Sequence, residues 1–429
     1  MTSPFDTIVA PITGSSASPV AIIRLSGPQA WEIAGSLSIG KASIERPRFA
    51  QYLKFSTGDD GYLILFEPGR SYTGEESAEL SIHGSRASVS TMLEAAKRSG
   101  ARPAEPGEFT QRAFMNGRID LTEAEGVRDT IEAKTEAQMR LANVMRDGEL
   151  HQVLSGLSDE LVGVLAAIEA SVDFSEEIGE IEPESLGNRI QAVITSLSNL
   201  LATAETGRIM REGLRIAIVG PPNAGKSSLL NRLLGAERSI VTEIAGTTRD
   251  YVEERADFDG FPVVLIDTAG LRETDDLVES IGVQKSRAIA ANADLIWYVA
   301  DSREVDEHFQ PEFERPVIRV ANKIDLAVAP DSWIGISCVN GDGLEELIES
   351  AKVHFENPLG IAIQLRHQPE LEEAVEELQI AKEVLEFNRP PDLAAVGLRS
   401  AIQAIGRITG ETSDADMIAR IFRDFCIGK

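Results

Sequence analysis

One eight-residue segment constrains the fold of this chain more than any other: Gly220-Pro-Pro-Asn-Ala-Gly-Lys-Ser227. It follows the apolar run Leu214–Val219, and the residues from Ser228 onward are typical of a helix. In a strand–loop–helix turn of this kind the glycines let the backbone curl, so that main-chain N–H groups surround phosphate oxygens. Lys226 then reaches the terminal phosphates and the hydroxyl of Ser227 binds Mg²⁺. This context favours a phosphate site over a tight turn without a ligand.

Two further motifs follow apolar strands later in the chain. Asp267-Thr268-Ala269-Gly270 ends the next strand, where a carboxylate holds Mg²⁺ through water and a glycine N–H senses the terminal phosphate. Asn322-Lys323-Ile324-Asp325 ends another strand. The Asp325 carboxylate can accept both N1–H and N2–H of guanine, a donor pair that adenine does not offer.

Two loops complete a guanine-nucleotide-binding domain. Thr242–Thr248 lies between the first two motifs, so Thr248 completes the Mg²⁺ shell as a switch residue. Ser337-Cys338 ends the last strand and supports the guanine through its main chain. The predicted GTP contacts are Asn223, Ala224, Gly225, Lys226, Ser227, Ser228, Thr242, Glu243, Ile244, Ala245, Gly246, Thr247, Thr248, Asp267, Thr268, Ala269, Gly270, Asn322, Lys323, Asp325, Ser337 and Cys338.

The residue after the Asp267–Gly270 motif is Leu271, where many GTPases have the glutamine that orients the attacking water. Two residues are candidates to replace it. The side-chain oxygen of Asn223 can bind a monovalent cation near the β and γ phosphates. Glu279 can position the water, or it is one more solvated acid in an acidic loop.

The hydrophobic pattern divides the chain into parts. Residues 1–118 have the short β-like runs of a mixed α/β domain, and residues 119–210 and 355–429 have helical periodicity. Residues 211–354 alternate strand-like and helical segments, which predicts a mostly parallel, doubly wound sheet. The predicted strands are Thr7–Ala10, Val20–Leu25, Tyr62–Phe66, Ala78–Ile82, Leu214–Val219, Val263–Ile266, Leu295–Ala300, Val317–Ala321 and Trp333–Ser337. We expect one helical domain that is interrupted by an inserted α/β domain.

Within the helical part, Asp120 and Glu123 form a capping-box-like helix start, and a second helix is predicted over about 150–172. A third helix carries one apolar stripe: Ile190, Val193, Leu197 and Leu200.

Composition limits the functions open to the chain. The formal net charge is −28, so any RNA contact must come from a local basic surface. The two cysteines, Cys338 and Cys426, cannot form a disulfide framework. No apolar segment approaches the roughly 18 residues of a membrane span. We expect a cytoplasmic protein.

The sequence resembles the tRNA modification GTPases of the MnmE (TrmE) family over essentially its whole length. Beyond the nucleotide motifs, the resemblance lies in Pro106-Gly-Glu-Phe-Thr-Gln-Arg-Ala-Phe-Met-Asn-Gly-Arg-Ile-Asp-Leu121 and the terminal Phe425-Cys-Ile-Gly-Lys429. It implies an N-terminal α/β domain that binds tetrahydrofolate and dimerises (1–118), and a helical bundle domain (119–210 and 355–429). The bundle is interrupted by an inserted Ras-like P-loop G domain (211–354). The chain departs from the family pattern at Gly14–Pro19 and looks shortened around Thr57–Ile64.

The resemblance also implies an activity. Family members work as homodimers with an FAD- and NADH-dependent partner of the MnmG (GidA) type, in a heterotetramer or larger complex. Together they add an aminomethyl or carboxymethylaminomethyl group to C5 of the wobble uridine of tRNA. The one-carbon unit comes from a tetrahydrofolate derivative, 5-formyl or methylene. GTP hydrolysis is stimulated by K⁺ and by dimerisation of the G domains.

Site residues carry over by motif. The resemblance places K⁺ on Asn223, Thr242, Ile244 and Thr247, and Mg²⁺ on Ser227 and Thr248. It makes Glu279 the catalytic glutamate, with Lys226 on the phosphates. The folate positions are Arg24, Glu79, Arg118 and Lys429.

Cys426 has three interpretations. A prenylation site is disfavoured by the final Lys429. A nucleophile would attack C6 of the uridine as a thiolate stabilised by Lys429 or Arg423. A structural residue would seat the tail so that Lys429 reaches the folate. We favour a functional, catalytic role for Cys426 over the structural one, because the resemblance covers the whole tail.

Two other classes remain open at the sequence level. A ribosome-assembly GTPase would share the G motifs but should carry a basic RNA-binding domain. A non-catalytic, GTP-dependent scaffold would use the G domains only to dimerise. Stoichiometric folate binding separates the tRNA-modifying enzyme from both.

Overall fold

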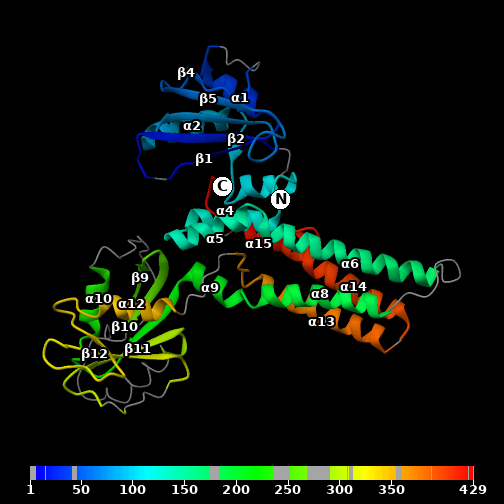
Figure 1. The fold of residues 1–429 in the computed structure, drawn as a ribbon. Coiled ribbons are helices and arrows are strands. Elements are labelled where there is room, and N and C mark those ends of the chain that lie inside the picture. Colours follow the sequence, from blue (N-terminus) through cyan, green and yellow to red (C-terminus); the bar gives the residue numbers. More distant parts are fainter. Residues whose placement is uncertain are drawn as a thin grey trace, which may run out of the picture. The chain divides into compact units, whose positions relative to one another are not determined.

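The computed structural model describes residues 6–14, 16–40, 46–173, 183–235, 252–267, 290–306, 308, 313–353, 360–387, 389–423 and 425–428. The chain forms two compact units. One comprises Met1–Arg128, Leu150–Ser158 and Ile402–Lys429, and the other comprises Asp129–Glu149 and Asp159–Ala401. Figure 1 shows the elements of both units. The boundaries 118/119, 210/211 and 354/355 remain predictions.

A seven-stranded sheet forms the first part of the chain, in the order β3-β4-β5-β6-β2-β1-β7. Neighbouring strands are antiparallel except for the parallel pair β1 and β7. The strands are β1 Ile8–Pro11, β2 Val20–Ser26, β3 Ser38–Ile39, β4 Gln51–Phe55, β5 Asp60–Phe66, β6 Ser77–His83 and β7 Arg102–Pro103. The four predicted strands are confirmed; β4, whose polar and exposed residues disguise it, was not predicted.

Helices α1 (Ala30–Leu37) and α2 (Arg86–Arg98) pack against this sheet. The core between them is built from alternate residues of the strands, such as Ile23, Leu25 and Leu80, each at most 1% exposed. Every second residue from Ala21 to Leu25 on β2 and from Ala78 to Ile82 on β6 belongs to this core, because successive side chains of a strand point to opposite sides.

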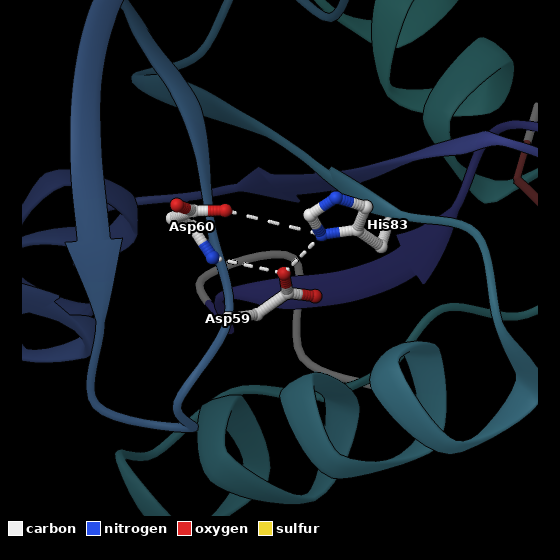
Figure 2. Close-up of side chains that lie close together, drawn as sticks. All are labelled: Asp59, Asp60 and His83. Atoms are coloured by element: carbon white, nitrogen blue, oxygen red, sulfur yellow. Dashed lines mark hydrogen bonds and ion pairs between the residues drawn. The ribbon is translucent and has the colours of Figure 1, made fainter.

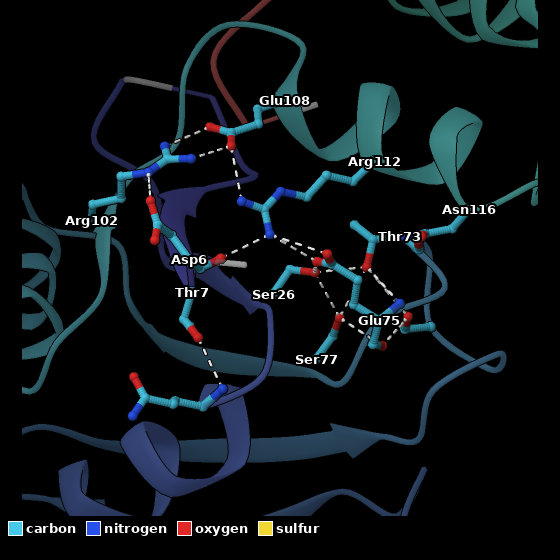
Figure 3. Close-up of polar contacts among 12 residues, drawn as sticks. Asp6, Thr7, Ser26, Thr73, Glu75, Ser77, Arg102, Glu108, Arg112 and Asn116 are labelled. Carbon is cyan, nitrogen blue, oxygen red and sulfur yellow. Dashed lines mark hydrogen bonds and ion pairs between the residues drawn. The ribbon is translucent and has the colours of Figure 1, made fainter. Parts of the chain in front are cut away.

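Helix α3 (Glu108–Met115) is held to the sheet by a partly buried network of charges (Figure 3). The Arg112 guanidinium donates to Glu75 at 3.0 Å and to Glu108 at 3.0 Å. Arg102 donates to Glu108 at 2.6 Å and to Asp6 at 3.1 Å. Burial opposes ionisation of Glu108, but hydrogen bonds from both arginines hold its pKa below the usual value. Glu108 therefore stays ionised between the two arginines at neutral pH.

Helices dominate the middle and the end of the chain: α4 Leu121–Glu132, α5 Glu136–Arg146, α6 Glu149–Asp173, α8 Pro183–Leu201, α9 Ala204–Glu212, α13 His367–Glu386, α14 Pro391–Thr409 and α15 Ala415–Arg423. The predicted cap of α4 is confirmed in both directions. Asp120 N–H donates to Glu123 at 2.7 Å, and Glu123 N–H donates to the Asp120 side chain at 3.0 Å. The predicted stripe of α8 is buried, and α8 lies side by side with α13 (Figure 1).

A six-stranded sheet forms the inserted part, in the order β13-β12-β11-β8-β10-β9. All neighbours are parallel except β9 and β10. The elements are β8 Leu214–Val219, α10 Lys226–Leu234, β9 Val252–Phe258, β10 Phe261–Asp267, β11 Leu295–Asp301, β12 Val317–Asn322, β13 Ile334–Ile336 and α12 Leu344–Lys352. The predicted parallel sheet is confirmed; the charged edge strand β9 was not predicted.

In the described part of the chain, no helix is both long enough and apolar enough to cross a membrane.

Candidate functional site

The phosphate loop lies at the carboxyl end of β8, between two parallel neighbours, β10 and β11. Gly225 precedes α10 in a left-handed conformation, and Leu229 and Leu233 bury the inner face of that helix. The carboxyl edge of a parallel sheet is where open α/β folds bind ligands, and the helix N-terminus adds its positive dipole end. The predicted strand–loop–helix arrangement is therefore present.

The predicted phosphate and magnesium residues lie in this loop. The Lys226 ammonium donates to the carbonyl oxygens of Gly220 and Pro221, at 3.0 and 2.9 Å. The Ser227 hydroxyl donates to the buried Asp267 carboxylate at 3.1 Å. Because Asp267 is the last residue of β10, the fold brings a hydroxyl and a carboxylate oxygen together beside the loop.

Asn322 joins the guanine motif to the phosphate loop. Its side-chain amide donates to the Ala224 carbonyl at 2.9 Å, and its side-chain oxygen accepts from the Lys323 N–H at 2.8 Å. Gly225 permits this approach, since a Cβ at that position would lie 2.2 Å from the Asn322 amide nitrogen and its φ is +92°. A side chain at residue 225 would therefore displace Asn322.

Lys323 makes a second link, with a residue that the sequence did not single out. Its ammonium donates to the Asn223 carbonyl and to the Asp301 carboxylate, both at 2.8 Å. Asp301 also accepts from Arg303 at 2.7 Å. Hydrogen bonds from Arg303 and then Lys323 hold the pKa of Asp301 well below its usual range. The sequence did contain a signal for this role: Asp301 is the last residue of the apolar strand β11, just as Asp267 is the last residue of β10.

The residues predicted to recognise guanine are also close together. The Ser337 hydroxyl donates to Asp325 at 2.7 Å, which orients the carboxylate predicted to read guanine. The Cys338 N–H donates to the Asn322 side chain at 3.4 Å. Burial raises the pKa of the Cys338 thiol to about 11, so this thiol is neutral at physiological pH. The predicted support of the guanine through the Cys338 main chain does not need an ionised thiol.

Several predicted residues lie outside the described part of the structure: Thr242, Glu243, Ile244, Ala245, Gly246, Thr247, Thr248, Thr268, Ala269, Gly270, Glu279 and Lys429. Their roles remain predictions.

In the N-terminal sheet, Arg24 and Glu79 face each other across β2 and β6. Two guanidinium nitrogens of Arg24 donate to one Glu79 oxygen, at 3.0 and 2.8 Å. The guanidinium lies over the rings of Tyr72 and Phe109, 4.9 and 5.4 Å from their centroids. Its third nitrogen, Nη1, is buried and has no hydrogen-bond partner among the described residues. A buried N–H group without an acceptor lowers the stability of the folded protein, because its hydrogen bond to water is lost and not replaced. This nitrogen is therefore suited to donate to a ligand oxygen.

Arg118 lies on the exposed turn after α3, and its stem packs within 3.0 Å of where a Gly74 side chain would begin. Among the described residues, no hydrogen bond or ion pair connects it with Arg24 or Glu79. The structure thus pairs two of the predicted folate residues and leaves the third separate from them.

The C-terminal segment is seated at the start of α3. The Gly107 N–H donates to the Cys426 carbonyl at 3.2 Å, while the Cys426 side chain is exposed. Phe425 is buried against Phe422, and the Arg128 guanidinium lies 5.9 Å from the centroid of the Phe425 ring. The main chain and Phe425 hold the segment, so its attachment does not depend on the thiol.

Comparison with known proteins gives a consistent picture. A family model described as the MnmE helical domain matches residues 121–426, and one described as the GTP-binding protein TrmE N-terminus matches residues 7–118. A tRNA modification GTPase MnmE of Aquifex aeolicus is 42% identical, over 98% of this chain and 99% of its own. Proteins of the same name from Akkermansia muciniphila and Carboxydothermus hydrogenoformans are 40% and 38% identical, over 100% and 99% of this chain and 100% and 99% of theirs. With its N-terminal α/β sheet, its helices and its inserted P-loop sheet, the chain belongs to the MnmE family of tRNA modification GTPases.

Proposed function

We propose that this chain hydrolyses GTP as part of the modification of tRNA wobble uridines, with a tetrahydrofolate derivative and an FAD- and NADH-dependent partner of the MnmG type. The observation that carries the GTPase part is the direct link between the two loops at one sheet edge. Asn322 and Lys323 of the guanine motif hydrogen-bond to the carbonyl oxygens of Ala224 and Asn223 in the phosphate loop.

The residues at this edge suit a Mg²⁺–GTP complex. The Ser227 hydroxyl and the Asp267 carboxylate are hard oxygen donors that lie 3.1 Å apart, and such donors match Mg²⁺. Lys226 would hold the terminal phosphates, and Asp325 would accept from the guanine edge. Bound Mg²⁺ would neutralise charge on the phosphoryl group during transfer.

K⁺ would bind at Asn223, together with the backbone oxygens of Thr242, Ile244 and Thr247. Asn223 has a left-handed backbone (φ 63°) and is exposed, which is consistent with a side chain offered to a ligand. Such a cation would do the work of an arginine finger. Hydrolysis that runs equally fast in K⁺ and in Na⁺ would contradict this part of the proposal.

The N-terminal sheet would hold the folate. The Glu79 carboxylate is suited to the amino-pyrimidine edge of a pterin, and the unpartnered Nη1 of Arg24 is suited to a ligand oxygen. Bound tetrahydrofolate would supply the one-carbon unit. Dimerisation, cytoplasmic location and the tail residues Cys426 and Lys429 belong to the same proposal.

Folate binding to the full-length protein tests the proposal most directly. Calorimetry with 5-formyltetrahydrofolate should show one site per chain. Arg24→Lys keeps the charge beside Glu79 but removes the free nitrogen, so we expect at least tenfold weaker binding. Arg48→Lys, at an exposed arginine, is the matched control and should leave folate binding unchanged. Absent folate binding would favour a GTP-dependent scaffold or a ribosome-assembly GTPase.

Mass spectrometry of wobble uridines from cells lacking this chain tests the cellular function. The modification should disappear and should return with the unsubstituted gene. Unchanged wobble uridines in the deletion strain would overturn the proposal.

A further inference from the structure

Three side chains of types that can bind a metal ion converge at one end of the N-terminal sheet (Figure 2). They are Asp59, Asp60 and His83, and one donor atom from each lies within 4.8 Å of the other two. His83 Nδ1 lies 2.5 Å from Asp59 Oδ1 and 4.0 Å from Asp60 Oδ1. The predictions from sequence assign no role to these residues.

Strand pairing produces this convergence. Asp59 lies in the turn between β4 and β5, and Asp60 is the first residue of β5. His83 is the last residue of β6, the antiparallel neighbour of β5. Gly61 lets the two strands approach, because a Cβ there would lie 1.9 Å from the Ser81 carbonyl oxygen. The position of the carboxylates opposite the imidazole is therefore a property of the backbone.

Each carboxylate is oriented by a hydroxyl group on its other oxygen. Tyr52 donates to Asp60 Oδ2 at 2.6 Å, and the Ser88 hydroxyl donates to Asp59 Oδ2. The Oδ1 atoms of both carboxylates are thereby left facing the same imidazole nitrogen. Hydroxyl groups that orient ligand carboxylates in this way are typical of the surroundings of metal sites.

We propose that Asp59, Asp60 and His83 bind a divalent transition-metal ion, and that Zn²⁺ is the ion that matches them best. Two carboxylates and a neutral imidazole carry a total charge of −2, which a divalent cation balances. Without a metal ion, a protonated imidazole would balance the charge of only one of the two carboxylates. Oxygen and imidazole ligands are those that Zn²⁺ accepts at about 2.0–2.2 Å.

The present spacing needs a small adjustment. Tetrahedral ligands at these bond lengths lie roughly 3.4 Å apart. The Asp59–His83 distance of 2.5 Å would widen and the Asp60–His83 distance of 4.0 Å would shorten. Binding requires an unprotonated Nδ1, with the ring proton on Nε2. The His83 side chain is 68% exposed, so one coordination position stays open to water.

The bound ion would connect the β4–β5 turn with β6 and, through Ser88, with α2. It would stabilise this end of the N-terminal sheet. The site does not depend on the proposed function, because none of its residues is among the predicted nucleotide or folate contacts.

Zinc binding to the metal-free, full-length protein tests the proposal. Calorimetry with ZnCl₂, and metal analysis after gel filtration, should show one more bound Zn²⁺ per chain in the unsubstituted protein than in His83→Ala. Asp60→Asn should weaken this site at least tenfold. His308→Ala removes another exposed histidine and should leave the stoichiometry unchanged.

Circular dichroism of the metal-free proteins serves as the folding control and should be equal in all variants. If the unsubstituted protein and His83→Ala bind the same number of zinc ions, the proposal is wrong and the three residues form an ion pair only.

Discussion

At the scale of single residues, Lys323 shows how one side chain serves two parts of a site. Its ammonium connects the phosphate loop, through the Asn223 carbonyl, with Asp301 at the end of β11. Asp301 is 4% exposed and ionised, so Lys323 is held by charge-assisted hydrogen bonds, which are about twice as strong as neutral ones. The base-recognition motif therefore also orders the loop that would carry the phosphates.

Replacing Asp301 tests this link. Asp301→Asn keeps the shape but removes the charge that holds Lys323, so GTP affinity should fall about three- to tenfold, which corresponds to roughly 0.7–1.4 kcal/mol. Fluorescent-nucleotide titration measures the change. Asp306→Asn, at an exposed acid of the same loop region, should have no effect. Equal affinities for the two variants would show that Asp301 does not position Lys323.

Asp325 should determine the choice of base. In Asp325→Asn one acceptor becomes a donor and opposes the guanine N1–H and N2–H groups, so the preference for GTP over ATP should fall by at least tenfold. Competition between the two nucleotides measures this ratio, with Asp331→Asn as an exposed control. An unchanged ratio would refute the assignment of Asp325.

The two cysteines should differ in reactivity. With a pKa of about 11, roughly one Cys338 thiol in a thousand is ionised at pH 8, and the group is half-buried. Iodoacetamide at pH 8 should therefore modify the exposed Cys426 first, and raising the pH toward 10 should accelerate modification of Cys338. Peptide mass spectrometry follows both sites. Faster labelling of Cys338 at pH 8 would contradict its buried, neutral state.

At the scale of elements, charge attaches α3 to the sheet. Arg112 is buried and lies between two carboxylates, Glu75 and Glu108. In a low dielectric the removal of one member leaves an uncompensated charge, which is far more costly than the loss of an exposed pair. Helix α3 forms the middle of the Pro106–Leu121 motif. The motif therefore contains the residues that attach α3 to the sheet as well as the candidate folate residue Arg118.

Two arginines in the same helical spacing allow a matched comparison. Arg112→Ala should destabilise the N-terminal sheet by about 3–5 kcal/mol. Arg140→Ala, which breaks an exposed i,i+4 pair with Glu136, should cost about 0.3–0.5 kcal/mol. Hydrogen exchange of β1 and β2 peptides should accelerate roughly a hundredfold or more in the first variant and hardly at all in the second. Similar exchange in both would show that the network is not stabilising.

At the scale of the whole molecule, the proposed function combines GTP hydrolysis in the inserted part of the chain with tRNA modification, for which the C-terminal segment carries a candidate residue, Cys426. The C-terminal segment is attached to the start of α3 by the Cys426 carbonyl and by Phe425. The Cys426 thiol itself is exposed and takes no part in that attachment. It is therefore free for chemistry that the nucleotide site does not perform.

Replacing the thiol separates its chemistry from GTP hydrolysis. Cys426→Ser should leave the hydrolysis rate unchanged, because none of the nucleotide contacts changes, and should lower wobble-uridine modification in cells at least tenfold. Mass spectrometry of tRNA digests from complemented cells gives the measurement. Full modification with the serine variant would exclude an essential thiol, and loss of folate binding would favour a seating role.

Features that depend on neighbouring residues could be predicted from the sequence, because each is formed by one contiguous segment. The phosphate loop between β8 and α10, the reciprocal cap of Asp120 and Glu123, and the buried stripe of α8 all follow from residue spacing. Strand β9, at the edge of the inserted sheet, and β4, next to the two-residue edge strand β3, were missed because they carry polar and charged residues. Positions at or beside an edge tolerate such residues, and a central strand does not.

The sequence by itself determined the class of nucleotide site, the family and most central strands, since each depends on neighbours along the chain. Only the tertiary structure decided which distant side chains meet. Arg112 with Glu75, Lys323 with Asp301, and His83 with Asp59 are brought together by strand register and helix packing. Leu141 of α5 and Met210 of α9 likewise belong to the core of the inserted sheet, although both precede it in the sequence. Burying apolar surface drives that packing without regard to sequence separation, and no local pattern encodes its partners.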